Sequence, residues 1–182
     1  ATVTTHDLPP TAGYLEGEHV EIRAELGLLE RDAAEERAAD EQQRVAWIER
    51  LADVGLLSRE IADDVINAPA AGSVSPRRAH FAARVDRHVD ELVEALHGYV
   101  SRSPARLVGV YLPDAVGDRR PVNQPGTVDE YPNWRVPMTD AKGRPVLLDD
   151  LIDGRAGDLA IRLAHVVGRK TASVNVASVG DL

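Results

Sequence analysis

The sequence contains no cysteine and few aromatic residues, with one Phe, two Trp and four Tyr among 182 residues. Without cysteine the chain has neither a disulfide nor a thiolate metal site. No apolar run approaches the ~20 residues that a membrane-spanning helix needs. The net charge of −9 argues against a nucleic-acid backbone or an anionic membrane as the main partner, because both attract basic surfaces. We therefore expect a cytoplasmic globular protein that binds neither.

The length of 182 residues and the apolar content of 43% suit one large domain or a compact piece of a bigger one. The chain begins Ala-Thr-Val-Thr-Thr, with no initiator Met and no signal-peptide pattern. This start has two interpretations: an upstream part is missing, or the Met of a Met-Ala start has been removed.

Polar and aromatic side chains gather in one stretch, residues 123–135, which reads Asn-Gln-Pro-Gly-Thr-Val-Asp-Glu-Tyr-Pro-Asn-Trp-Arg. Its two prolines fix φ, and Gly126 permits a positive φ. A rigid loop of this composition is typical of ligand presentation. In the alternative interpretation, Tyr131 and Trp134 cover an edge of the core and Arg135 pairs with a carboxylate.

A second candidate lies near the start of the chain. The β-branched residues before His6 and Asp7 predict the end of a strand, which Leu8-Pro9-Pro10 then terminates. An Asp and a His at a strand end can hold charge and bind hydroxyl groups of a ligand. Alone, the dipeptide also fits an Asx-turn formed by Asp7.

Helical periodicity and capping signals dominate the remainder. We expect one continuous helix from Ser75-Pro76 to about Ser101, and a buried parallel strand at 106–112 whose central Gly109 suggests close approach of another group. Further helical segments are expected at 18–29, 31–54, 59–67, 147–152 and 158–169.

The order is strand end, helices, strand, long loop and helix, which is the pattern of a parallel α/β fold. The fold class expected is α/β by origin but mainly α in this chain: the C-terminal portion of a (β/α)8 barrel with a large helical insertion. The expected regions are 1–104 (strand end plus helices), 105–170 (last strand, active-site loop and helix) and 171–182 (an extended or disordered tail).

Two motifs together resemble those of the amylomaltases, the 4-α-glucanotransferases of the α-amylase clan. The first is Thr5-His6-Asp7-Leu8-Pro9, followed by Gly13. The second is Asn-Gln-Pro-Gly-Thr followed by Tyr-Pro-Asn-Trp-Arg, within 123–135. Their order and the helical segment between them also agree, and the resemblance extends to about Lys170.

The resemblance implies an enzyme that transfers α-1,4-glucan segments between maltooligosaccharides or other α-1,4-glucans by a retaining double displacement, without a cofactor. It implies that Asp7 is the third carboxylate, which stabilises the transition state, and that His6 binds the same sugar. In the second motif it points to Asn123 as a sugar or supporting contact, with Gly126 in the loop that closes over the site. Trp134 is a candidate for stacking on a glucose ring or for anchoring the loop.

The family's nucleophile and acid/base lie upstream of the His-Asp motif, so the resemblance gives them no counterpart here. Four acidic residues between 32 and 40 sit in a charged helical run and are expected on a solvated face: Asp32, Glu35, Glu36 and Asp40. We therefore expect the isolated chain to be inactive. Its expected partners are glucans, together with the missing N-terminal part or a second copy.

The other histidines, His19, His80, His88, His97 and His165, are expected at the surface or its boundary, and their spacing gives no metal site. One alternative function remains: a non-catalytic, mostly helical interaction module. Its apolar stripes, on the helices at 41–54 and 77–101, would then be exposed and pack on a partner.

Overall fold

A computed structural model describes residues 1–67, 77–154 and 158–172. Helices make up its regular structure, and the β-structure within these ranges is one isolated antiparallel bridge, Thr139 to Pro145. In chain order the helices are α1 (Thr11–Glu16), α2 (Glu18–Glu25), α3 (Ala33–Asp53), α4 (Arg59–Asn67), α5 (Arg77–Arg87), α6 (Val89–Ser101), α7 (Leu112–Val116), α8 (Leu148–Ile152) and α9 (Leu159–Ala172).

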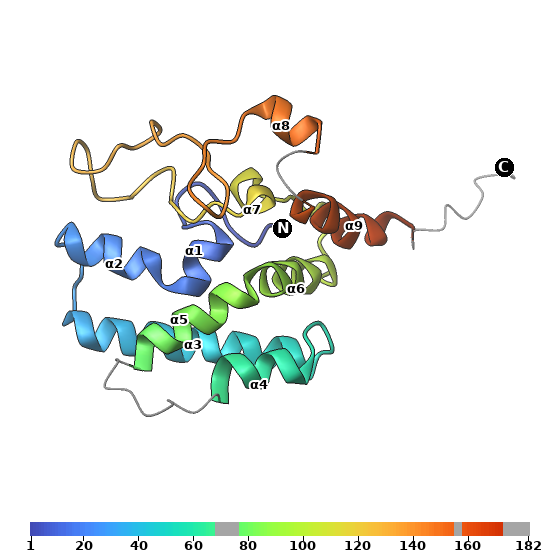
Figure 1. Cartoon of the computed structure of the whole chain (residues 1–182), viewed down its shortest axis with the longest axis horizontal. Coiled ribbons are helices and arrows are strands. Elements are labelled where there is room, and N and C mark those ends of the chain that lie inside the picture. The colour runs from blue at the N-terminus through green and yellow to red at the C-terminus, as the bar shows by residue number, and fades with distance from the viewer. Residues whose placement is uncertain (68–76, 155–157, 173–182) are drawn as a thin grey trace, which may run out of the picture.

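The helices are stacked around α6 (Figure 1). In this view α3 and α4 lie below it, α1 lies to its left, and α9 packs against it from above. The long loop of residues 117–147 runs over the top, next to α1 and α7. One hydrophobic core joins these elements, and its fully buried side chains include Leu15, Ile48, Leu51, Val85, Leu92 and Leu163.

This core corrects the expectation of exposed apolar stripes. Ile48 and Leu51 of α3 and Leu92 of α6 are all 0% exposed, because the two faces pack on each other and on neighbouring helices of the same chain. The observation that motivated the interaction module is therefore absent from the described structure.

Most predicted helices are present, with three differences. The expected helix from Ser75 to Ser101 is divided at His88, whose φ of −121° leaves the helical range and whose ring lies 3.1 Å from Asp64; Ser75 and Pro76 lie outside the described residues. The helix expected at 18–29 ends at Glu25, and Gly27 follows with a φ of +67°. Two short helices, α1 and α7, were not predicted.

The two predicted strands, at 1–7 and 106–112, are not strands in the described structure. The two segments do meet. The Ala1 amino group donates to the Leu107 carbonyl at 2.6 Å, and Gly109 N–H donates to the Ala1 carbonyl at 2.9 Å. This is the bond pattern of a parallel pair, but a single pair of bonds makes no ladder. Nothing approaches within 4 Å of the Cβ position of Gly109, contrary to the sequence-based expectation.

Two polar residues expected near the surface are buried instead. Asp40 is 8% exposed, because Arg44 one turn later brings its guanidinium to 2.8 Å and His19 approaches to 3.0 Å. His97 is 0% exposed and lies at the centre of α6. Burial of such groups requires compensating partners, and those partners lie on other elements or one turn away.

No helix formed by the described residues is both long and apolar enough to cross a membrane. At the other end of the chain, α9 continues through Thr171 and Ala172. The remainder of the predicted tail, 173–182, lies outside the described residues, as do the side chains of 77–80, including His80. The division into regions at residue 104 stays a prediction.

Candidate functional site

His6 and Asp7 lie at the tip of a tight turn. Leu8 N–H donates to the Thr5 carbonyl at 3.1 Å, and the buried Thr4 hydroxyl donates to the Pro9 carbonyl at 2.7 Å. These bonds, with the fixed φ of proline, hold the turn while both functional side chains remain 54% exposed. The carboxylate of Asp7 is not used in an Asx-turn, since it faces side chains instead.

The 123–135 stretch stabilises itself through Asn133. The Asn133 side chain accepts from Gln124 N–H at 2.8 Å and donates to the Thr127 hydroxyl at 2.8 Å. Tyr131 adds a further tie by donating its hydroxyl to the Pro121 carbonyl at 2.6 Å. The loop therefore keeps its shape largely through its own side chains.

Trp134 has a conformation that is unusual for a bulky residue. Its φ is +61°, the only positive value at a non-glycine residue among those described, and its N–H donates to the Val122 carbonyl at 2.8 Å. Such backbone strain costs on the order of 1–3 kcal/mol and concentrates at functional sites. The indole is 65% exposed, so Trp134 does not cover the core. Arg135 is also exposed and forms no ion pair among the described residues.

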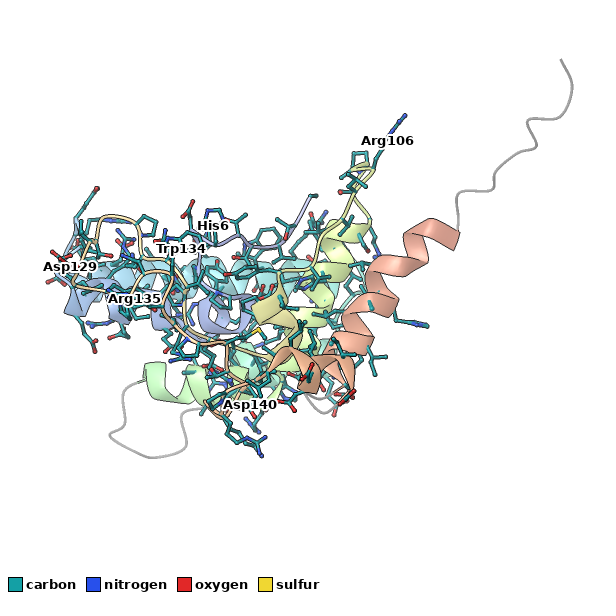
Figure 2. The ribbon with its side chains drawn as sticks, turned by 90° about the horizontal axis from the view of Figure 1, so that it is seen from above. His6, Arg106, Asp129, Trp134, Arg135 and Asp140 are labelled. Carbon is teal, nitrogen blue, oxygen red and sulfur yellow. The ribbon has the colours of Figure 1, made fainter. Side chains whose placement is uncertain are left out.

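The turn and the loop meet at Asp7. Asn123 Nδ2 donates to Asp7 Oδ1 at 2.8 Å, and His6 Nε2 lies 3.3 Å from Asp7 Oδ2. The rings of His6 and Trp134 are 5.2 Å apart at 43°, and Figure 2 shows the two side by side. Asn123 lies 116 positions from Asp7 in sequence and still contacts it. Together Asn123 and His6 contact both oxygens of the Asp7 carboxylate.

Gly126, the remaining candidate, lies outside this group. Its φ is +89°, and a Cβ there would be 3.7 Å from Leu28, in the connection between α2 and α3. The structure thus brings together four of the five candidates, and Gly126 serves the turn of the loop. Among the described residues no cluster of His, Asp or Glu has the arrangement of a metal site.

An apolar pocket of about 360 Å³ lies behind the His6-Asp7 turn, with Leu8 and Pro9 in its wall. Its other wall comes from helices, through Tyr14, Trp47, Leu96 and Tyr99. None of the four clustered side chains lines it. They face open surface instead, where a carboxylate, an imidazole, an amide and an indole are available together.

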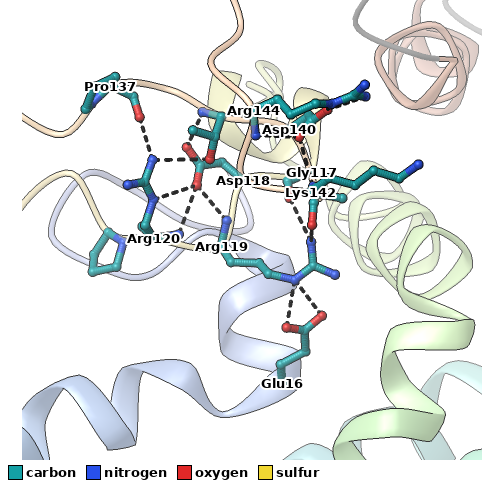
Figure 3. Close-up of polar contacts among 12 residues, drawn as sticks. Glu16, Gly117, Asp118, Arg119, Arg120, Pro137, Asp140, Lys142 and Arg144 are labelled. Atoms are coloured by element: carbon teal, nitrogen blue, oxygen red, sulfur yellow. Dashed lines mark hydrogen bonds and ion pairs between the residues drawn. The ribbon is translucent and has the colours of Figure 1, made fainter.

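The loop is fixed to the helices by two consecutive residues (Figure 3). Arg119 donates to Glu16 of α1 at 2.7 and 2.8 Å, as Figure 3 shows. It also donates to Asp86 of α5 at 2.8 Å. Asp118, 2% exposed, accepts from the backbone N–H groups of Arg119 and Thr139 at 2.8 Å each. These bonds close the base of the loop and attach it to α1.

A second buried carboxylate, Asp114 of α7, joins the two halves of the site. Its oxygens accept from Thr11 N–H at 2.6 Å and from the Thr11 hydroxyl at 2.7 Å. His97 Nε2 lies 3.5 Å away. Sequence reasoning missed this group, although the Leu-Pro-Asp sequence at 112–114 is a helix-start signal: proline in the first turn beside an acidic residue.

Burial raises the pKa of Asp114 above its usual range, although the Thr11 bonds and His97 oppose the shift. A carboxyl whose pKa is raised on folding contributes stability below its unfolded pKa, and this is lost as the pH rises through the folded pKa. Asp114→Asn mimics the protonated form. We therefore expect the free energy of unfolding of Asp114→Asn, relative to the wild type, to rise between pH 3.5 and pH 7 in urea titrations.

Asp140 provides a control of opposite sign. Backbone N–H groups, first that of Arg144, lower its pKa, so its contribution is present at higher pH and lost on acidification. The stability of Asp140→Asn relative to the wild type should therefore fall as the pH rises. Parallel slopes for the two variants would contradict the assignment of a raised pKa to Asp114.

This mostly helical unit presents a carboxylate, an imidazole, an amide and an indole together from two linked loops. Residues 1–142 match the family model described as 4-alpha-glucanotransferase. The chain belongs to the 4-alpha-glucanotransferase family, which confirms the resemblance seen in its motifs.

Individual relatives agree. A 4-alpha-glucanotransferase of Mycobacterium tuberculosis (strain H37Rv) is 45% identical over 161 residues, covering 88% of this chain and 19% of that protein. One of Haemophilus influenzae is 28% identical over 134 residues, covering 74% of this chain and 17% of that protein. The crystal structure of amylomaltase from Corynebacterium glutamicum matches with a TM-score of 0.70 and 41% identity, over 91% of this chain and 21% of that one. The chain thus spans about a fifth of the length of these relatives.

Proposed function

We propose that this chain forms part of the site at which a 4-α-glucanotransferase binds and transfers α-1,4-glucans, with Asp7 as the carboxylate that stabilises the transition state. The observation that carries the proposal is the meeting of Asn123 and Asp7 at 2.8 Å across 116 positions of sequence. His6 and Trp134 complete the same group. Its members come from the two motifs that resemble the family.

The chemistry needs a fixed negative charge. Retaining glycosyl transfer passes through an oxocarbenium-like transition state, which a preorganised carboxylate stabilises. Asp7 is preorganised because His6 and Asn123 of the same chain contact its two oxygens. The nucleophile and the acid/base would then come from the part of the relatives that this chain does not span.

The other members of the group have distinct roles. Asn123 holds Asp7 in place through its amide, and His6 binds a sugar hydroxyl next to the carboxylate. The exposed indole of Trp134 offers a flat apolar face on which the CH groups of a glucose ring can stack. Gly126 acts through the shape of the loop, because its positive φ permits the turn.

We also propose that the segment belongs to a (β/α)8 barrel. The parallel hydrogen-bond pattern between Ala1 and Leu107–Gly109 supports this, because adjacent strands of such a barrel are parallel and their loops build the site at one end. The His6-Asp7 turn and the 117–147 loop both follow these paired segments.

The cytoplasm is the compartment we propose.

The proposal is tested by titrating the 182-residue chain with maltotriose to maltoheptaose while recording ¹⁵N–¹H spectra. We expect shifts confined to His6, Asp7, the Asn123 side-chain amide and the Trp134 indole, a higher melting temperature, and no disproportionation of maltotriose. Shifts at other residues, or no shifts at any sugar concentration in the titration, would refute a glucan site. The rise in melting temperature should be absent in Asp7→Asn.

Replacing Asn123 tests its role beside Asp7. Asn123→Ala removes one donor, whereas Asn123→Asp places a second carboxylate where the donor lay 2.8 Å from Asp7. Since like charges at this distance repel, we expect Asn123→Asp to weaken maltoheptaose binding more than Asn123→Ala does, with the gap narrowing in high salt.

The control for this pair is Asn67→Asp, which makes the same change on α4, where Asn67 donates to Asp63 at 3.4 Å. Isothermal titration calorimetry should give wild-type affinity for this variant. Equal losses for Asn123→Ala and Asn123→Asp, independent of salt, would show that Asn123 acts without the charge of Asp7.

A further inference from the structure

We propose that Asp114 is a positioning residue of the site. Its two hydrogen bonds with Thr11, hereafter the Thr11–Asp114 clamp, align Asp7 with Asn123 and Trp134. For its relevance to glucan transfer this inference rests on the proposed function. The alignment itself is a property of the unliganded chain and can be measured without sugar.

The clamp is buried and two-pronged. Thr11 and Asp114 are 2% and 1% exposed. The backbone N–H of Thr11 donates to Asp114 Oδ1 at 2.6 Å and its hydroxyl donates to Oδ2 at 2.7 Å. Two bonds from one residue to one carboxylate fix both the distance and the rotation between the elements that carry them.

Its place in the chain makes it a control point for the site. Thr11 begins α1 and follows Asp7 after the rigid Leu8-Pro9-Pro10 segment. Asp114 lies in α7, which leads directly into the loop that carries Asn123 and Trp134. The clamp spans 103 positions of sequence. Lengthening the hydrogen bonds of the clamp therefore moves the His6-Asp7 half of the site relative to the loop that carries Asn123 and Trp134.

His97 restricts the chemistry that the clamp tolerates. Its Nδ1 lies 2.9 Å from the Val93 carbonyl, which can only accept, so Nδ1 carries a proton. Its Nε2 faces Asp114 Oδ2 at 3.5 Å, so a replacement at 114 must suit His97 as well as Thr11. Asparagine at 114 can keep both contacts with Thr11: its oxygen accepts from Thr11 N–H, and its amide donates to the Thr11 hydroxyl oxygen, whose own proton must then turn to another acceptor.

Thr11→Val and Thr11→Ser separate the hydroxyl from the packing of its methyl group. Valine keeps the volume and loses the donor, while serine keeps the donor. The readout is the nuclear Overhauser cross-peak between the rings of His6 and Trp134, which are 5.2 Å apart, together with the shift of the Asn123 side-chain amide. We expect Thr11→Val to lose the cross-peak, and Thr11→Ser and Asp114→Asn to keep it.

A control variant distinguishes positioning from general destabilisation. Val65→Ala removes two methyl groups from a fully buried side chain on α4, far in sequence from both ends of the clamp. It should lower the melting temperature while leaving the cross-peak intact. Thr11→Val retaining the cross-peak, or Thr11→Ser and Val65→Ala losing it, overturns the inference.

The sugar titration separates this inference from the proposed function. If the cross-peak depends on the Thr11 hydroxyl and maltoheptaose binds the wild type, we expect Thr11→Val to weaken binding and Thr11→Ser to preserve it. If maltoheptaose does not bind the wild type, the proposed function fails while the positioning role of the clamp stands. If binding occurs and the cross-peak ignores Thr11, the positioning inference alone fails.

Discussion

Gly13→Ala is expected to destabilise the chain by about 3 kcal/mol and to separate the two halves of the site. A Cβ at Gly13 would lie 2.0 Å from the carbonyl oxygen of Arg119 and 2.9 Å from its carbonyl carbon. These are backbone atoms that cannot rotate away, so either α1 or the base of the loop must shift. Urea unfolding followed by circular dichroism gives the free energy.

The shift has a structural cost beyond the overlap itself. Arg119 is held by Glu16 of α1 and Asp86 of α5, and Asp118 beside it accepts backbone N–H groups from both ends of the loop. Displacing the Arg119 carbonyl strains both sets of bonds. We therefore expect Gly13→Ala to lose the cross-peak between His6 and Trp134 as well as stability.

The matched control is Gly168→Ala, the same change within α9, where nothing lies within 4 Å of the new Cβ. Alanine is the better helix former, so this variant should gain up to about 1 kcal/mol. Gly13→Ala receives the same benefit from propensity, so the difference between the free energies of the two variants measures the overlap. Similar free energies for the two variants would show that α1 and Arg119 separate easily.

The residues at the centre of the site were accessible from sequence because they lie in two local motifs. Each motif carries its own signal: β-branched residues before His6-Asp7, and prolines with polar and aromatic side chains in 123–135. Most helices were likewise predictable, since periodicity and capping are local properties. Local signals do not give the distance between motifs, which only the tertiary structure supplies.

The burial of two polar groups, His97 and Asp40, was missed in the sequence. His97 reads as a boundary residue on an amphipathic helix, and Asp40 reads as part of a solvated charge run. Each is buried because of residues on other elements or one turn away: Asp114 for His97, and Arg44 with His19 for Asp40. Propensity and hydrophobic pattern describe how apolar and polar residues alternate along the chain. They do not identify the partner on which the burial of a charge depends.

The strands show the opposite case: the local sequence predicts more regular structure than the chain forms. β-Branched residues and a short apolar run predicted strands at 1–7 and 106–112. The described chain forms one parallel pair of bonds there. Strand propensity describes how well side chains suit a half-buried sheet. A sheet exists only where neighbouring strands extend the ladder.

Asp7→Asn is expected to lower the rate of glucan transfer by about 10²- to 10³-fold while leaving the fold intact. The rate is measured after this chain replaces its 45% identical counterpart in the Mycobacterium tuberculosis relative, with maltotriose as donor and acceptor. Asparagine keeps the shape of Asp7 but removes the negative charge that, in the proposed function, stabilises the developing oxocarbenium ion. Since that charge matters most in the transition state, kcat should fall far more than KM rises.

Asp129→Asn is the control, because Asp129 is an exposed carboxylate of the same loop, away from His6 and Trp134 (Figure 2). It changes the net charge equally and should leave kcat unaltered. The folded state of Asp7→Asn is checked through its unfolding curve, which we expect to overlay that of the wild type, since the Asp7 side chain is 54% exposed. Loss of a transition-state contact should leave far less than about a tenth of the wild-type kcat. If Asp7→Asn keeps more than this, Asp7 takes no part in the chemistry and serves only as the hydrogen-bond acceptor of Asn123.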